Sequence, residues 1–153
     1  MASVRLLSPL TGVVLPVTAV PDPVFAEGMV GPGLAIEPLR TATQTVVAPA
    51  DGVIGALHPH AFALELSEGR TILVHLGIDT VSLAGSGFTL HVQRGQAVRA
   101  GDHLVTWSPL DVHAAQLATI CPVVALQAEP DLLTVLVPEG GTVHAGEPLL
   151  DWA

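Results

Sequence analysis

Residues 92–107, VQRGQAVRAGDHLVTW, and residues 137–152, VPEGGTVHAGEPLLDW, are two copies of one pattern. A glycine turn, a valine, an Ala-Gly-acid turn, a leucine-containing strand and a final tryptophan recur in register. A weaker pair relates residues 8–14, SPLTGVV, to residues 48–54, APADGVI. One such turn is common among β proteins, whereas two copies of equal length indicate a duplicated β-turn-β unit. We therefore expect a wrapped sheet with internal repetition.

Short apolar segments between turn signals dominate the chain, which contains 15 glycines and 13 prolines in 153 residues. Alternating apolar and polar residues in such segments are typical of β-strands. We predict strands at residues 12–17, 33–38, 45–48, 52–57, 61–66, 71–76, 87–90, 104–107, 122–125, 134–137 and 148–152. A helical turn is expected at residues 109–117, after a capping Ser108. The predicted fold is all-β, an antiparallel β-sandwich or barrel with minimal helix, in which residues 1–153 form a single domain.

Composition excludes several classes of function. The net charge is −9, and the five basic residues are all arginines, so a phosphate backbone would be repelled and nucleic-acid binding is excluded. The negative charge would attract a basic protein partner, or simply keep the chain soluble. Cys121 is the only cysteine, which fits a cytoplasmic setting. Without a secretion signal or an apolar run of about 18 residues, we expect no membrane insertion, and we expect a monomer.

Two histidines stand out against this β background. Residues 71–81, TILVHLGIDTV, predict a strand that carries His75 to a glycine turn, and His60 lies upstream in the segment HPHAF at residues 58–62. The intervening residues 67–70, SEGR, predict a hairpin turn. A turn centred between residues 67 and 68 places His60 directly opposite His75 on one face of the hairpin. Because a one-residue slip would move one ring to the other face, this prediction depends on the register.

Such a pair suits the transfer of a phosphoryl group to a histidine. One nitrogen of His75 must be unprotonated and exposed, and the other should donate a hydrogen bond, which a carbonyl near Gly77 can accept. His60 can donate a hydrogen bond to the phosphoryl oxygens, and Asp79 can face an incoming cationic side chain. A histidine buried in the core is the simpler interpretation for a single strand residue, but the pair beside a glycine turn favours a site.

The segment VHLGIDTV at residues 74–81 resembles the active-site segment of the glucose-class enzyme IIA of the bacterial phosphoenolpyruvate-dependent sugar phosphotransferase system. Residues 20–27, 31–36, 47–55, 60–62 and 121–124 also fit this family in its order. The resemblance implies a compact antiparallel β-sandwich that accepts phosphate on His75 from the phosphocarrier HPr. It further implies delivery to a cysteine of an enzyme IIB, of a glucose or N-acetylglucosamine-type permease, by a free-standing donor.

The same resemblance implies roles for residues around the histidines. His60 is the supporting histidine, and the surface that binds the partners comprises an apolar patch with an acidic rim. The residues that match the patch are Val24, Phe25, Val30, Phe62, Leu73 and Val81, and those that match the rim are Asp22 and Asp79. The family usually carries a small hydroxylated residue where this chain has His58, so that a third imidazole is expected near the site.

Two alternatives remain at this stage. His58, His60 and His75, with Asp79, could bind zinc, in patterns that lysostaphin-like zinc peptidases also use. The reversed order of those patterns and the lack of a secretion signal disfavour a peptidase, and incidental zinc binding is the stronger form of this alternative. The other alternative is a binding module whose phosphorylation gates regulatory partners, although no residue identifies a target. The proposed carrier requires no cofactor.

Overall fold

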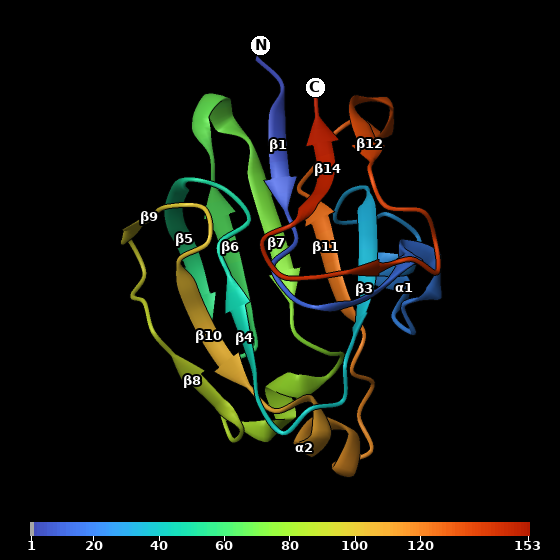
Figure 1. The fold of residues 1–153 in the computed structure, drawn as a ribbon, viewed down its shortest axis with the longest axis vertical. Coiled ribbons are helices and arrows are strands. Elements are labelled where there is room, and N and C mark those ends of the chain that lie inside the picture. Colours follow the sequence, from blue (N-terminus) through green and yellow to red (C-terminus); the bar gives the residue numbers. More distant parts are fainter. Residues whose placement is uncertain (1) are drawn as a thin grey trace.

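The computed structural model describes residues 2–153 and consists mostly of antiparallel β-strands (Figure 1). The largest sheet has eight strands in the order β13 (Thr142–Val143), β2 (Gly12–Pro16), β3 (Gly33–Pro38), β11 (Cys121–Ala125), β7 (Thr71–His75), β6 (Ala61–Glu65), β5 (Gly52–His58) and β9 (Ala97–Val98). One small sheet comprises β1 (Val4–Leu7), β14 (Pro148–Trp152) and β12 (Leu133–Val135), and the other comprises β4 (Gln44–Val47), β10 (His103–Trp107) and β8 (Phe88–Leu90). The prediction of an antiparallel β-sandwich is confirmed.

The strand order reveals an approximate twofold relation between two halves of the molecule. One half is contiguous and contains β4 to β10, whereas the other is divided into β1 to β3 and β11 to β14. We call them the contiguous half (residues 44–107) and the divided half (residues 4–38 and 121–152). From one edge the large sheet runs through β13, β2, β3 and β11, and from the other edge it runs through the equivalent strands β9, β5, β6 and β7. Strands β11 and β7 are neighbours at its centre. The predicted duplication is therefore present, with one copy inserted into the other.

Reciprocal hydrogen bonds join the two halves where the weaker sequence repeat lies. The amide of Leu7 donates to the carbonyl of Pro49 at 2.8 Å, and the amide of Val47 donates to the carbonyl of Pro9 at 2.8 Å. These prolines occupy the same place in residues 8–14 and 48–54. The weak repeat thus marks the place where the two halves cross, and both copies have a proline-containing turn there.

The core lies between the large sheet and the two small sheets. Ile54, Leu64 and Ile72 project from the large sheet into one cluster with Trp107 and Trp152, the final residues of the two sequence repeats. A second, smaller cluster lies on the outer face of the central strands and contains Val20, Phe25, Ala35, Ile78, Ile120 and Val124. The chain between β2 and β3 supplies Val20 and Phe25, so this segment covers part of the outer face.

The predicted strands all occur, with bounds that differ by at most a few residues. Helix α2 (Pro109–Ala114) is shorter than predicted, and the Ser108 hydroxyl accepts the amide of Asp111 at 3.1 Å as expected of an N-cap. The sequence analysis missed β1, β9, β13 and helix α1 (Pro23–Ala26), which Asp22 caps through the amide of Val24 at 2.9 Å.

Single-turn 3-10 helices occur at η1 (Val17–Ala19), η2 (Ser67–Gly69), η3 (Thr80–Leu83) and η4 (Pro130–Leu132). Among residues 2–153, none of the helices has the length and apolar character that a crossing of a bilayer demands.

Candidate functional site

His75 ends β7 on the outer face of the large sheet. Ile72 and Val74 point into the core and are fully buried, so strand alternation leaves His75 half-buried on the other side. Its Nδ1 lies 2.5 Å from the carbonyl oxygen of Gly77. Because a carbonyl only accepts, Nδ1 carries the proton and Nε2 keeps the free lone pair. The bond that was expected from the Gly77 region is therefore present.

Gly77 makes this bond possible through its backbone conformation. Its φ is +74°, which other residues adopt only under strain, and an added Cβ would lie 2.8 Å from the carbonyl oxygen of Ala118. Gly77 is followed by Ile78, which is buried in the outer cluster, and by Asp79, which also has a positive φ of 62°. The turn folds the carbonyl of Gly77 back toward the ring of His75.

His60 meets His75, although the predicted register was wrong by one residue. Ala61, and not His60, pairs with His75, because the hairpin loop has three residues centred on Glu68. The amide of Leu66 donates to the carbonyl of Arg70 at 2.8 Å and closes this loop. Even so, the ring centroids of His60 and His75 lie 5.1 Å apart in an edge-on arrangement. His60 belongs to the two-residue turn between β5 and β6, so strand alternation does not dictate the side on which its ring lies.

His58 brings a third imidazole to the site. It ends β5, and its ring stacks on the ring of His60 with centroids 5.6 Å apart and an angle of 28° between the planes. Within residues 2–153, no group of three or more histidine, cysteine, aspartate or glutamate side chains is arranged to hold a metal ion. Zinc binding by His58, His60 and His75 therefore stays a prediction.

The surroundings keep both central histidines neutral. Burial lowers the pKa of His75 below its usual value, and the hydrogen bond to Gly77 and the charges of Asp22 and Asp79 only partly oppose this effect. Burial also lowers the pKa of His60, and the neighbouring rings of His75 and His58 lower it further. Because a neutral imidazole has a free lone pair, His75 can act as a nucleophile at neutral pH.

The residues predicted to bind partners differ in exposure, and one of them was wrongly assigned. Val24 and Val81 are exposed, Val81 to 68%, while Val30 and Leu73 are partly buried against the outer cluster. Phe25 is largely buried, but its ring lies 5.5 Å from that of His75. Phe62 was wrongly assigned to this surface: it is only 1% exposed, because it pairs with Val74 and both side chains face the core.

Two acidic residues lie near His75, and one further apolar residue is exposed close to Val24. Asp22 is half-buried and Asp79 is exposed, and the charges of both favour the protonated form of His75. The sequence analysis missed Met29, which is 70% exposed and whose amide bonds to the carbonyl of Val24 at 3.2 Å. Its position after the unpredicted helix α1 left no periodic signal from which to find it.

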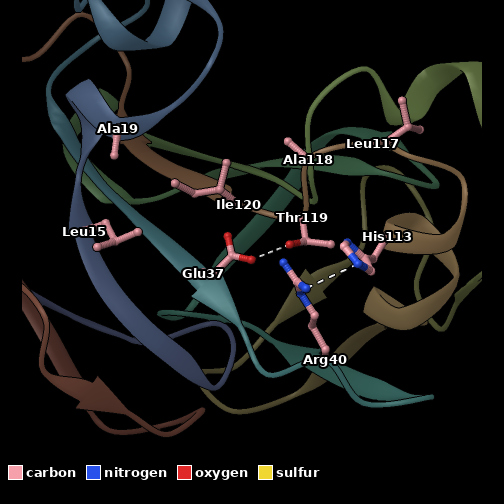
Figure 2. A pocket seen from close by; sticks show the side chains of 9 residues that line it. All are labelled: Leu15, Ala19, Glu37, Arg40, His113, Leu117, Ala118, Thr119 and Ile120. Carbon is pink, nitrogen blue, oxygen red and sulfur yellow. Dashed lines mark hydrogen bonds between the residues drawn. The ribbon is translucent and has the colours of Figure 1, made fainter.

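A buried segment supports the Gly77 turn from behind. The amide of Ile78 donates to the carbonyl of Ala118 at 3.0 Å, and the thiol of Cys121 donates to the carbonyl of Thr119 at 3.2 Å. The Thr119 hydroxyl in turn donates to the carboxylate of Glu37 on β3 (Figure 2). Burial raises the pKa of the Cys121 thiol, so this cysteine stays protonated and plays a structural part.

An open cavity of about 450 Å³ lies on the far side of this segment. Figure 2 shows its polar side, where Nη1 of Arg40 lies 3.3 Å from Nε2 of His113. Neither His60 nor His75 lines this cavity. The two histidines are instead half-buried beside exposed residues such as Val24 and Val81, an arrangement that suits contact with another protein better than enclosure of a small molecule.

Fold and site together define a β-sandwich protein with a half-buried histidine, whose Nε2 is free, beside apolar and acidic side chains. The family model described as phosphoenolpyruvate-dependent sugar phosphotransferase system, EIIA 1, matches residues 4–131. The chain therefore belongs to this family, whose members are phosphotransferase components.

Several relatives show the same similarity. The chain is 36% identical over 149 residues to the glucose-specific EIIA component of Haemophilus influenzae, which covers 96% of this chain and 87% of that protein. It is 47% and 48% identical over 127 residues to the glucose-specific and mannose-specific EIIBCA components of Corynebacterium glutamicum. Those matches cover 82% of this chain but only 18% of each relative, so the chain spans less than a fifth of their length.

Among solved structures, glucose permease IIA from Mycoplasma capricolum matches with a TM-score of 0.85 and 32% sequence identity. The match covers 99% of this chain and 96% of that one. The family resemblance drawn from residues 74–81 is thereby confirmed over the whole fold.

Proposed function

We propose that His75 carries a phosphoryl group from HPr to the cysteine of an enzyme IIB of a glucose or N-acetylglucosamine-type permease, in the cytoplasm. In the first step the lone pair of His75 Nε2 attacks phosphorus, while the bond from phosphorus to the donor histidine breaks and its electrons return to the donor nitrogen. In the second step the cysteine thiolate attacks phosphorus, and the electrons of the P–N bond return to Nε2. No cofactor takes part, because the imidazole itself is the nucleophile.

The observation that carries this proposal is the hydrogen bond from His75 Nδ1 to the carbonyl of Gly77. It leaves Nε2 free before transfer, and it stabilises the positive ring that forms when Nε2 bears phosphate. His60 lies with its ring edge-on to His75, within reach of a group on Nε2, where it can donate to a phosphoryl oxygen. The same arrangement serves both directions of transfer, since the phosphoryl group occupies the same place in each.

The surface around His75 supports protein partners of basic character. Val24, Met29 and Val81 expose apolar area, while Asp22 and Asp79 add negative charge next to it. An apolar patch with a charged rim is the usual anatomy of a protein interface. The overall charge of −9 would also speed encounter with a basic carrier.

Labelling with radioactive phosphoenolpyruvate, enzyme I and HPr tests the assignment of His75. We expect stoichiometric, acid-labile label in the wild type and none in His75→Gln. The His60→Gln variant should accept phosphate but pass it to enzyme IIB far more slowly. Label that persists in His75→Gln would refute the proposed acceptor, and normal delivery by His60→Gln would show that His60 is dispensable.

A further inference from the structure

His58 is the one ring of the imidazole cluster that the proposed transfer leaves without a role. It ends β5 opposite Ala61, at the mouth of the two-residue turn that contains His60. The ring planes of His58 and His60 are 28° from parallel, whereas those of His60 and His75 are 67° from parallel. The ring of His60 therefore stacks on that of His58 and lies in an edge-to-face arrangement with that of His75.

The ring of His60 has little else to orient it. Its backbone carbonyl accepts the amide of Leu76 at 2.7 Å, which fixes the main chain of the turn. Within residues 2–153, however, no protein atom makes a hydrogen bond with either nitrogen of the His60 ring. Contact with neighbouring rings is then what sets the direction in which its N–H group points.

We infer that His58 is a positioning residue, which holds the ring of His60 by stacking so that an N–H of His60 points toward the phosphoryl group. This inference rests on the proposed function of His75 and His60.

A direct role for His58 as a second hydrogen-bond donor to the phosphoryl group is the competing interpretation. The ring geometry disfavours it, because the His58 ring contacts that of His60, and its closest ring partner is not His75. The two interpretations demand different chemistry at position 58. Stacking needs an aromatic face, whereas donation needs an N–H group.

Substitutions at position 58 separate these possibilities. We would compare His58→Phe, which keeps a ring face, with His58→Gln, which keeps an N–H donor, and with His58→Ala, which keeps neither. His103→Ala is the matched control, because His103 is an exposed histidine at the start of another strand. The rate of phosphoryl transfer to saturating enzyme IIB is measured for each, so that a change in partner affinity does not enter the comparison.

We expect His58→Ala and His58→Gln to slow this transfer about two- to tenfold, the range that an aromatic pair supports. His58→Phe and His103→Ala should stay within about twofold of the wild type. Ring proton shifts of His60 in NMR spectra should move in the Ala and Gln variants and be largely retained with Phe. A purely structural role of His58 would give no rescue by Phe.

Besides the lack of rescue by His58→Phe, two outcomes would overturn the inference. Retained transfer in His58→Gln with loss in His58→Phe would assign direct donation, and wild-type rates in His58→Ala would leave His58 without a role. The stoichiometry of phosphate on His75 is measured in the same samples. If the wild type itself takes no label, the proposed function fails, whereas full label with altered transfer bears on His58 alone.

Discussion

The contiguous half and the divided half share one scaffold, yet only the contiguous half carries the cluster of His58, His60 and His75. The equivalence extends to single hydrogen bonds: the amide of Leu76 donates to the carbonyl of His60 at 2.7 Å, and that of Ala125 donates to the carbonyl of Pro32 at 2.8 Å. At the place of His60 the divided half therefore has a proline. By the same alignment, the position in the divided half that is equivalent to His75 is occupied by the buried Val124.

Burial explains why only one of the two equivalent strand ends presents a histidine. In the divided half, Val124 and Ala35 lie in the outer cluster, which the segment with Val20 and Phe25 covers. In the contiguous half, β7 ends at the Gly77 turn, and the ring of His75 remains partly exposed beside that cover. A duplicated scaffold thus supplies two similar strand ends, and what covers each of them decides which can host a reactive side chain.

The largest expected effect tests whether the two halves contribute equally to the stability of the fold. Trp107 and Trp152 end the two sequence repeats, and both are buried in the same core. Trp107→Ala and Trp152→Ala should each lower the free energy of unfolding by about 3–5 kcal/mol, because each leaves a large cavity. Denaturant titrations measure this, and values that differ by several kcal/mol between the two variants would break the equivalence.

The Gly77 turn is what the contiguous half has after β7 and the divided half lacks after β11. We expect Gly77→Ala to cost about 1–3 kcal/mol, since the new Cβ meets the Ala118 carbonyl at 2.8 Å in a strained conformation. Phosphate acceptance should also fall, because the carbonyl that bonds His75 Nδ1 moves.

The matched control for this turn is Gly95→Ala. Gly95 also has a positive φ, of +86°, but an added Cβ would meet no atom within 4 Å. It should cost only about 1 kcal/mol and leave phosphate acceptance intact. Equal loss of phosphate acceptance in both variants would show that the Gly77 turn has no specific role in acceptance by His75.

Acidification should weaken the folded state through the histidines of the contiguous half. The pKa values of His75 and His60 are lowered on folding, so between these values and the ordinary value of about 6.5 the unfolded chain binds more protons. Stability should therefore rise with pH through this window and fall as pH drops below about 6.5. In urea titrations at several pH values, His75→Gln should flatten this slope and His103→Gln should not, and an unchanged slope in His75→Gln would contradict the assignment.

The smallest expected effect compares two equivalent turn contacts. The Thr11 hydroxyl accepts the amide of Ala145 at 3.0 Å in one half, and an Asp51 carboxylate oxygen accepts the amide of Ala100 at 2.8 Å in the other. Thr11→Ala and Asp51→Ala should each cost about 0.5–1.5 kcal/mol in thermal or chemical unfolding. Neutral results for both would mean that backbone pairing alone holds these turns.

Local patterns were sufficient to predict much of the contiguous half. Alternation and turn residues located β5, β6 and β7, and the segment at residues 74–81 identified His75 as the reactive residue to be tested. Ser108 and Pro109 predicted the start of α2 because capping depends on neighbouring residues only. Two-residue strands such as β9 and β13 were missed, since they are too short to show alternation.

Other features were beyond the reach of the sequence pattern. The exact centre of the turn at residues 67–70 depended on the left-handed conformation of Glu68, which shifted the register and turned Phe62 into the core. Zinc binding and the single-domain assignment stay predictions. Helix α1 has one turn only, and its place over the outer face follows from packing rather than from its own pattern.

The sequence by itself determined that this protein is an antiparallel β fold with a duplicated turn unit and a histidine at a strand end, because periodicity and turn chemistry are properties of neighbouring residues. Only the tertiary structure decided which strands join the two halves, and that the rings of His58, His60 and His75 lie close together. The central pairing of β7 with β11 joins segments far apart in the chain. On the outer face of these strands, Val124 is buried in the outer cluster, whereas His75 remains partly exposed. Such contacts depend on the whole core, which no local stretch of residues encodes.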